Sequence, residues 1–237
     1  MPSSTPRIVY LANRPIGVSC LRVLLEAHME PVALICTSGP QAEGVAEMKN
    51  LMPHLPTFEG KEAFMKSTET LKELQPEYLL SVHFPLIIPR NILAIPSVGT
   101  LNLHPAYLPY NRGWHTPTWA IYEQTPYGAT LHWIDEGIDT GDIVAQKQIQ
   151  ILPTDTAHTL YQRALTAEAE LFQETMPHLK NGTLPHIPQR GAGTFHTKKD
   201  IETIRRIKPT DSAEERGRKI RALTTNKPEE AAYLTSN

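Results

Sequence analysis

Residues 7–28 read RIVYLANRPIGVSCLRVLLEAH. The run Arg7–Asn13 is short and almost wholly apolar, which predicts a buried β-strand. Five apolar residues of the segment Pro15–His28 recur at the spacing of one helix face: Ile16, Cys20, Val23, Leu24 and Ala27. Pro15 suits the first turn of a helix, because that position needs no backbone N–H. The stretch therefore predicts a strand followed by a helix, the building unit of an α/β fold.

The alternation of strand and helix continues through the first half of the chain. Short apolar runs predict further strands at Val32–Thr37, Tyr78–Phe84 and Gly99–His104, and a helical pattern lies at Glu62–Leu74. Units that alternate in this way build a mostly parallel sheet with helices on both faces. The predicted fold class is therefore α/β, a Rossmann-like, mostly parallel sheet covered on both faces.

The second half of the chain has a different pattern. Two strands are predicted at Tyr127–Ile134 and Asp142–Ile151, and a long amphipathic helix is predicted at Asp155–Lys180. Asn181 and Gly182 follow that helix directly and are typical of a helix C-terminus.

The C-terminal part is rich in charged residues. Lys198–Arg221 contains nine basic and five acidic residues, and we interpret it as a small helical appendage. A charged run of this kind is more often a solvated helix face than a phosphate-binding surface. We predict two parts, a main domain at residues 1–185 and an appendage at residues 186–237.

The composition excludes several classes of function. The 237 residues carry 23 Lys and Arg against 25 Asp and Glu, and a net charge of −2 argues against a general nucleic-acid binder. The two cysteines predict neither a disulfide framework nor a zinc motif. We see no apolar core of a signal peptide and no run long enough for a membrane span, so we expect a cytoplasmic protein that binds no membrane. The absence of G-x-G-x-x-G after the first strand, and of a Walker A sequence, argues against dinucleotide and P-loop enzymes.

The densest polar region is Leu101–Arg112, LNLHPAYLPYNR, which begins on a predicted parallel strand. Open α/β sheets bind their ligands at the carboxyl ends of such strands. Asn102 and His104 are two residues apart, so their side chains point to the same face of the strand. Two interpretations stay open, a hydrogen-bonded pair in the core and a binding site. The prolines that follow favour a stiff polar loop beside a site.

A second polar cluster is Asp135–Asp142, DEGIDTGD. Taken alone it is typical of a surface turn, and its spacing does not fit a calcium-binding loop. We interpret His115 and His132 as scaffold residues, because neither has a partner at the spacing of metal ligands. No metal site is expected.

Together the two clusters resemble a known family. The sequence NLHPAYLP at residues 102–109, followed by GIDTGD at residues 137–142, is similar to the motifs of N10-formyltetrahydrofolate-dependent formyltransferases. That family includes methionyl-tRNA, glycinamide ribonucleotide and sugar-amine formyltransferases. The resemblance runs from the first strand to about Lys180 and implies the formyltransferase fold. It also implies that Asn102, His104 and Asp139 are catalytic.

These residue types suit the transfer of a formyl group to an amine. Negative charge develops on the formyl oxygen during the attack, and Asn102 and His104 can each donate a hydrogen bond to it. A histidine can also take the proton that the amine loses near neutral pH. Asp139 would hold the imidazole or organise a water that carries the proton. Both roles of His104, general base and electrostatic stabiliser, stay open.

The resemblance implies the co-substrate as well. N10-formyltetrahydrofolate would bind with its pterin held largely by backbone groups of two loops. The cofactor-binding residues implied in this way are Phe84, Leu86, Ile88, Asp135 and Gly137. For the individual side chains at residues 86–88, ordinary core packing is the commoner interpretation.

The acceptor implied is a nucleotide-linked amino sugar. Residues 108–119, LPYNRGWHTPTW, and the basic segment are similar to the sugar N-formyltransferase branch. Members of that branch use dTDP-linked 3-amino or 4-amino 6-deoxyhexoses, serve lipopolysaccharide O-antigen biosynthesis and are commonly homodimers. Methionyl-tRNA formyltransferases carry a further C-terminal barrel, for which we expect the stretch after Gly191 to be too short. The predicted substrate contacts are Asn13, Arg14, Tyr110, Arg112 and Trp119.

Several alternatives remain at this stage. Asn13 is equally well explained as a helix cap and Trp119 as a core residue. Besides sugar formylation, the same core could hydrolyse formyltetrahydrofolate with water, act on another amine, or bind folate without catalysis.

Overall fold

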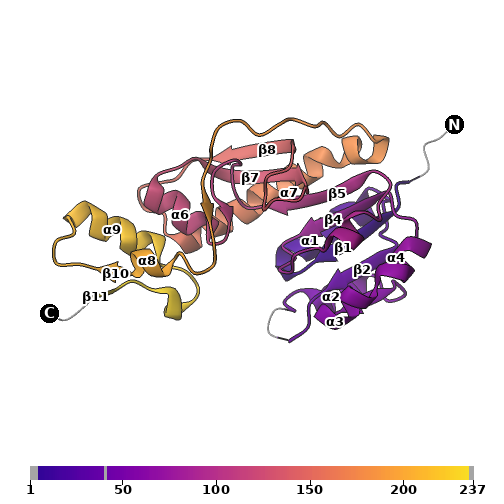
Figure 1. The fold of residues 1–237 in the computed structure, drawn as a ribbon, viewed down its shortest axis with the longest axis horizontal. Helices are drawn as coiled ribbons and strands as arrows, with labels where there is room; N and C mark the ends of the chain where they lie inside the picture. Colours follow the sequence, from indigo (N-terminus) through magenta and orange to yellow (C-terminus); the bar gives the residue numbers. More distant parts are fainter. Residues whose placement is uncertain (1–4, 40–41, 235–237) are drawn as a thin grey trace.

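A central sheet organises the structure (Figure 1). The computed structural model describes residues 5–39 and 42–234. Within these residues the sheet has seven strands, in the order β3-β2-β1-β4-β5-β7-β8. The strands are β1 (Ile8–Ala12), β2 (Ala33–Cys36), β3 (Thr57–Glu59), β4 (Tyr78–Val82), β5 (Gly99–His104), β7 (Tyr127–Trp133) and β8 (Ile143–Ile149).

Helices and short strand pairs complete the fold. The helices are α1 (Arg14–Glu26), α2 (Val45–Leu51), α3 (Lys61–Lys66), α4 (Thr68–Glu73), α5 (Arg90–Leu93), α6 (Thr116–Glu123), α7 (Ala157–Asn181), α8 (Glu202–Arg205) and α9 (Ala213–Ala222), with a 3₁₀ turn at Pro228–Glu230. Two short parallel pairs join β6 (Arg112–Gly113) to β9 (Phe195–His196) and β10 (Arg206–Ile207) to β11 (Tyr233–Leu234).

The sheet is mostly parallel. Strands β3, β2, β1, β4 and β5 run in the same direction, whereas β7 pairs antiparallel with both β5 and β8. The predicted α/β class with a mostly parallel sheet is therefore confirmed.

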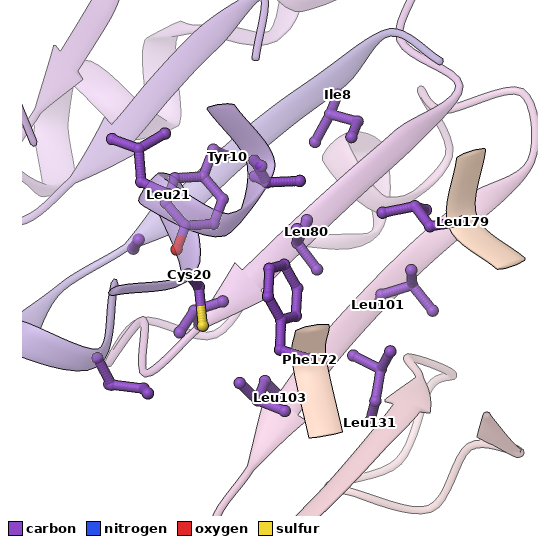
Figure 2. Packing of buried hydrophobic residues seen from close by; sticks show 14 of the residues in the cluster. Ile8, Tyr10, Cys20, Leu21, Leu80, Leu101, Leu103, Leu131, Phe172 and Leu179 are labelled. Carbon is purple, nitrogen blue, oxygen red and sulfur yellow. The ribbon is translucent and has the colours of Figure 1, made fainter. Parts of the chain in front are cut away.

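In β1 and β4, alternate residues enter two separate cores. Tyr10, Leu80, Leu101 and Leu103 pack against α1 and α7 on one face, and Figure 2 shows them around Phe172 of α7. The residues between them in β1 and β4 pack on the other face against α3, α4 and α5. Helices thus cover both faces, as the wholly apolar run of β1 requires.

Two predicted helices differ from the observed ones for local reasons, and one predicted helix end is confirmed. The expected helix Glu62–Leu74 is two helices, because the Ser67 hydroxyl donates to Phe64 O at 2.7 Å and competes with the helix at that point. The long helix begins at Ala157 instead of Asp155, since Thr156 caps it through reciprocal bonds with Thr159. Its predicted end at Gly182 is confirmed, with that glycine in the left-handed conformation at φ 63°.

The C-terminal segment packs on α6, at the end of the molecule opposite α3 (Figure 1). Trp119 of α6 shares a small core with Ile201, Ile204 and Leu223. This shared core and the β6–β9 pair connect the segment to the main sheet region. The predicted boundary between residues 185 and 186 stays a prediction.

Candidate functional site

The polar side chains of the two sequence clusters lie on the face of the sheet that carries α3, α4 and α5, next to the part that these helices cover. On β5, Leu101 and Leu103 enter the core under α7, so Asn102 and His104 point to the opposite face. Helices α3, α4 and α5 pack over β1 and β4 on that face. Loops at residues 105–115 and 134–142 follow β5 and β7 instead of helices. This arrangement brings the two sequence clusters together.

Neighbouring groups orient the Asn102 amide. Ser81 Oγ donates to Asn102 Oδ1 at 2.9 Å, which directs Nδ2 away from β4. His132 Nδ1 lies 2.7 Å from the carbonyl oxygen of Trp133 and donates to it, so His132 Nε2 accepts from Asn102 Nδ2 at 3.2 Å. The second N–H of the amide faces Asp139 Oδ1 at 3.5 Å, a long hydrogen bond. That N–H can therefore turn to an oxygen that gains negative charge.

Asp139 supplies the negative charge of the cluster. Its Oδ2 accepts a hydrogen bond from the Gly113 backbone N–H at 2.9 Å and lies 3.6 Å from His104 Nε2. Burial raises the pKa of this carboxyl, but His104, His132, whose Nε2 lies 3.5 Å from Asp139 Oδ1, and the Gly113 N–H outweigh burial and hold the pKa well below its ordinary value. Asp139 is therefore ionised at neutral pH, although its side chain is only 14% exposed.

His104 is buried and neutral at the same pH. Burial lowers the pKa of its imidazole, and the attraction of Asp139 opposes that effect only in part. Its Nε2 faces two acceptors, Asn111 O at 3.4 Å and Asp139 Oδ2 at 3.6 Å. These acceptors favour the tautomer with the proton on Nε2, which leaves Nδ1 as the basic nitrogen.

Hydrogen bonds fix the loop that follows His104. Asn111 has a left-handed backbone, φ 59°, and its side chain exchanges hydrogen bonds with Thr125 and donates to Pro126 O. Thr130 Oγ1 donates to Ala106 O at 2.7 Å, and Gln146 Nε2 donates to Leu108 O at 2.8 Å. The backbone carbonyls of Ala106 and Leu108, which follow His104 in the chain, are therefore held by side chains of β7 and β8.

Hydrogen bonds from Gln189 also fix the turn that carries Asp139. Gln189 Nε2 donates to the carbonyl oxygens of Asp139 and Gly141, at 2.9 and 2.8 Å. A Cβ at Gly141 would lie 2.0 Å from Trp133 O, so the close approach of the two segments requires glycine. Among the residues that the structure describes, no group of three His, Cys, Asp or Glu side chains is placed to hold a metal ion.

The loops predicted to hold the folate lie side by side. An ion pair between Arg90 and Glu136, 2.6 Å long, joins them, and Phe84 and Leu86 pack on the same core as Ile134. The individual roles differ. The Ile88 side chain is buried in that core. Asp135 Oδ1 accepts from Gly137 N and Thr140 Oγ1, so its carboxylate closes the turn. A Cβ at Gly137 would lie 2.0 Å from Thr140 Oγ1.

The predicted substrate contacts fall into two groups. Asn13 and Arg14 lie at the carboxyl end of β1, which β4 separates from β5. The buried Asn13 side chain ties β1 to β2 through Thr37. Exposed Arg14 donates to the hydroxyl of Tyr161 on α7 at 3.0 Å. These two residues are not part of the Asn102 cluster.

The second group belongs to the loop after His104 and to α6. Tyr110 and Arg112 are half-buried in that loop, and Arg112 donates to Ala192 O at 3.1 Å. Trp119 is buried in the core of the C-terminal segment, where its ring stacks on His196 at 3.7 Å between centroids. Trp119 is therefore a core residue and not part of the polar cluster around Asn102.

His132, interpreted from the sequence as a scaffold residue, lies in the polar cluster and supports the Asn102 amide. The imidazole lies beside Asn102 because β5 and β7 pair antiparallel with Asn102 opposite His132. Neighbours opposite each other on two strands share a face, so a correct register of β7 against β5 would have found this residue. Ser81 follows from the parallel register of β4 and β5 in the same way.

A separate groove of about 560 Å³ lies between the end of α6 and the ends of β7 and β8. Its lining includes none of Asn102, His104 and Asp139. The polar cluster, where charged groups meet, is therefore the candidate site, and this groove is not part of it. In the part of the chain that is described, no helix is both long and apolar enough to span a membrane.

Comparison with known proteins agrees with the motifs. The model of the formyl transferase family matches residues 20–176. A methionyl-tRNA formyltransferase of Halorhodospira halophila is 31% identical over an alignment of 231 positions that covers 92% of this chain and 73% of that relative.

Two solved structures share the fold. A 4-N formyltransferase from Francisella tularensis superposes with a TM-score of 0.83 at 22% identity, over 97% of this chain and 92% of that one. The formyltransferase PseJ from Anoxybacillus kamchatkensis, solved with UDP-4,6-dideoxy-4-formamido-L-AltNAc and tetrahydrofolate, gives 0.60 at 26% identity, over 83% and 88%. Because the family model covers β2 to β8, the polar cluster and most of α7, the chain belongs to the formyl transferase family and is an N-formyltransferase.

Proposed function

We propose that this protein transfers the formyl group of N10-formyltetrahydrofolate to the primary amine of a nucleotide-linked amino sugar. The observation that carries the proposal is the convergence of Asn102, His104 and Asp139 on the face of β5 where the helical layer ends. The group combines an oriented amide donor, a neutral base and a fixed anion. Acyl transfer to an amine requires all three.

The reaction needs one bond to form and one to break. The amine nitrogen attacks the formyl carbon, and negative charge moves to the formyl oxygen. The second N–H of Asn102, which faces Asp139 only at 3.5 Å, donates to that oxygen. One such donor contributes roughly 10²–10³ in turnover. The bond between the formyl carbon and N10 then breaks, and the new amide is released.

His104 moves the proton. The neutral imidazole accepts the proton that the amine loses and returns it to N10 of the departing folate. The imidazolium that exists between the two steps lies 3.6 Å from the Asp139 carboxylate. Because Asp139 is ionised and held by the Gly113 N–H, it stabilises this cation and keeps the ring in place.

The donor would bind beside the cluster. The loops at residues 84–90 and 134–140 lie together, and the second of them carries Asp139. Ile87 and Ile138 are exposed there, so the loops offer apolar surface as well as backbone donors and acceptors to a pterin ring. We assign Phe84, Leu86, Asp135 and Gly137 to this site, with Ile88 and the Asp135 carboxylate supporting the loops.

Two acceptors have specific support. The structural likeness to the Francisella tularensis 4-N formyltransferase covers almost the whole chain, including the C-terminal segment, and PseJ was solved with a UDP-linked sugar. These matches favour a nucleotide-linked amino sugar. Relatives named methionyl-tRNA formyltransferase match by sequence over 92% of the chain, and they favour the α-amine of methionyl-tRNA. The two acceptors can be separated directly.

The test is an acceptor panel with N10-formyltetrahydrofolate. It contains dTDP- and UDP-linked 3-amino and 4-amino sugars, methionyl-tRNA and a sample without any amine, each followed by mass gain and by release of tetrahydrofolate. We expect formylation of at least one nucleotide-linked sugar. Formylation of methionyl-tRNA alone would show that the acceptor is methionyl-tRNA and not a nucleotide-linked sugar. Release of tetrahydrofolate without an amine would identify a hydrolase.

Variants connect the activity to the cluster. We expect Asn102→Ala and His104→Ala to lose formyl transfer while the protein stays folded, and the double variant to be inactive. His158→Ala, a change of an exposed histidine on α7, serves as the control. Formyl transfer by the double variant at the wild-type rate would disprove the assignment.

A further inference from the structure

An exposed tryptophan stands next to the catalytic cluster. Trp114 follows Gly113, whose N–H donates to Asp139 Oδ2 at 2.9 Å. Its own N–H donates to His196 O at 2.9 Å, so the β6–β9 pair fixes the backbone at this point. The side chain of Trp114 is nevertheless exposed, at 43% of the residue surface. The indole therefore offers a rigid apolar surface close to the reacting groups.

A lysine of the C-terminal segment accompanies this indole. Lys198 Nζ lies over the Trp114 ring, 5.4 Å from its centroid, and the residue is exposed. The imidazole of His115 lies beside the same indole, with 6.4 Å between ring centroids. Its Nε2 is buried and has no hydrogen-bond partner. One place thus combines an open aromatic face, a cation and an unused polar nitrogen.

We propose that Trp114 and Lys198 form the subsite for the non-reacting part of the acceptor. The hexose ring packs on the open part of the indole, and Lys198 binds the diphosphate that links the sugar to the nucleoside. This inference rests on the proposed function, because it assigns the residues that recognise a nucleotide-linked sugar. It adds a specificity-determining pair that takes no part in the chemical step.

The order of groups along the acceptor matches the order in the structure. The amine must lie at His104 and Asp139, and the sugar ring that carries it begins one bond away. Trp114 follows the residue that contacts Asp139, and Lys198 Nζ lies over its ring. The polarised C–H groups of a sugar suit the negative face of an indole, and a lysine is a compact point charge for phosphate.

The contact would contribute to turnover as well as to affinity. Binding energy from remote parts of a substrate can hold the reacting atoms in position, so a truncated substrate loses rate. An amino sugar without its nucleotide should therefore be a poor acceptor for the wild type. It should also be insensitive to the charge at residue 198, since it carries no phosphate.

The experiment compares Lys198→Ala with Lys199→Ala, a matched change at the neighbouring exposed lysine. Binding of the nucleotide-linked amino sugar identified in the panel is measured by calorimetry without folate, and kcat/KM is measured with formyltetrahydrofolate. Loss of a charge-assisted contact should weaken acceptor binding about 10- to 100-fold in Lys198→Ala. We expect Lys199→Ala to bind like the wild type, and the KM for the folate to be unchanged in both.

Two further arms test the parts of the subsite separately. Trp114→Ala should lower kcat/KM for the nucleotide-linked sugar more than Trp114→Phe does, because phenylalanine keeps an aromatic face. With the methyl glycoside of the same amino sugar, Lys198→Ala and the wild type should turn over equally. Circular dichroism establishes that each variant is folded.

The outcomes separate this inference from the proposed function. Equal acceptor binding by Lys198→Ala and the wild type, with the wild type active on the sugar, overturns the inference alone. Equal losses in Lys198→Ala and Lys199→Ala also overturn it, because they would show a diffuse charge effect. A wild-type enzyme that formylates no nucleotide-linked amine overturns the proposed function and the inference together.

Discussion

Replacement of Asp139 by asparagine tests the catalytic role proposed for the charge of its carboxylate. Asparagine preserves the shape of the side chain but removes the anion that lies 3.6 Å from His104 Nε2. At an effective dielectric constant of about 20, a pair of unit charges at this separation interacts by about 4 kcal/mol. Since the imidazolium forms during proton transfer, its loss of stabilisation should lower the plateau of kcat by roughly a thousandfold.

The same variant should shift the pH dependence in a defined direction. Activity requires neutral His104, so kcat/KM falls as the pH drops through the pKa of His104. Burial lowers that pKa and Asp139 raises it. Without the carboxylate the pKa falls further, and the acidic limb of the profile moves to lower pH. A slower enzyme with a more acid-resistant profile is the expected signature.

The assay is the pH profile of kcat/KM between about pH 5 and pH 9, with formyl transfer followed by mass gain. Asp142→Asn is the matched control, because Asp142 belongs to the same turn, is 39% exposed and contacts only His186 among the charged groups described. It should behave like the wild type. The reasoning is refuted if Asp139→Asn keeps its plateau, or if its acidic limb stays in place or moves to higher pH.

Three further predictions concern stability and the turn. Burial raises the pKa of Asp139, but His104, His132 and the Gly113 N–H lower it more, so its ionised form stabilises the fold above about pH 4 and this contribution disappears as the pH falls. The unfolding free energy of Asp139→Asn, measured in urea, should therefore decrease less on acidification than that of the wild type, and parallel curves would contradict this. Glu168 is 0% exposed and both its oxygens lie 2.9 Å from His83 Nε2, so Glu168→Gln should cost about 1–3 kcal/mol in unfolding free energy. Glu170→Gln on the same helix, at a position 53% exposed, should cost less than about 0.5 kcal/mol, and equal losses would disprove the role of the buried pair. Gly137→Ala should reduce kcat/KM at least about tenfold with little change in global stability, because its Cβ would collide with Thr140 Oγ1. Gly217→Ala is the control and should retain activity, since a Cβ there meets nothing within 4 Å. Full activity of Gly137→Ala would show that the turn can shift freely.

Much of the sheet follows from local patterns in the sequence. The predicted strand Gly99–His104 has the observed boundaries, and the two-residue spacing of Asn102 and His104 places both side chains on one face. Helix α7 and its end at Gly182 follow from its apolar stripe and the glycine. These features are determined by residues close to one another in the chain, so no knowledge of the tertiary structure is needed.

The remaining features depend on distant partners. His132 enters the site through the antiparallel register of β7, which its own strand sequence does not determine. Trp119 belongs to a core whose other members come from residues 201–223, so its apolar surroundings could not be seen in α6 alone. Helix α2 and strand β3 are too short to leave a periodic pattern, and no element was predicted at either position.

The pairing of β6 with β9 limits how this protein can be recombined. Gly113 holds Asp139 through its N–H, and the same residue lies opposite His196 in the two-stranded pair. A Cβ at Gly113 would lie 2.3 Å from His196 O, so the two backbones are in close contact. The C-terminal segment therefore cannot be replaced without affecting the backbone at residues 112–113. A chimaera that joins the sheet to another module must supply a strand to residues 112–113, or the carboxylate loses the backbone that positions it.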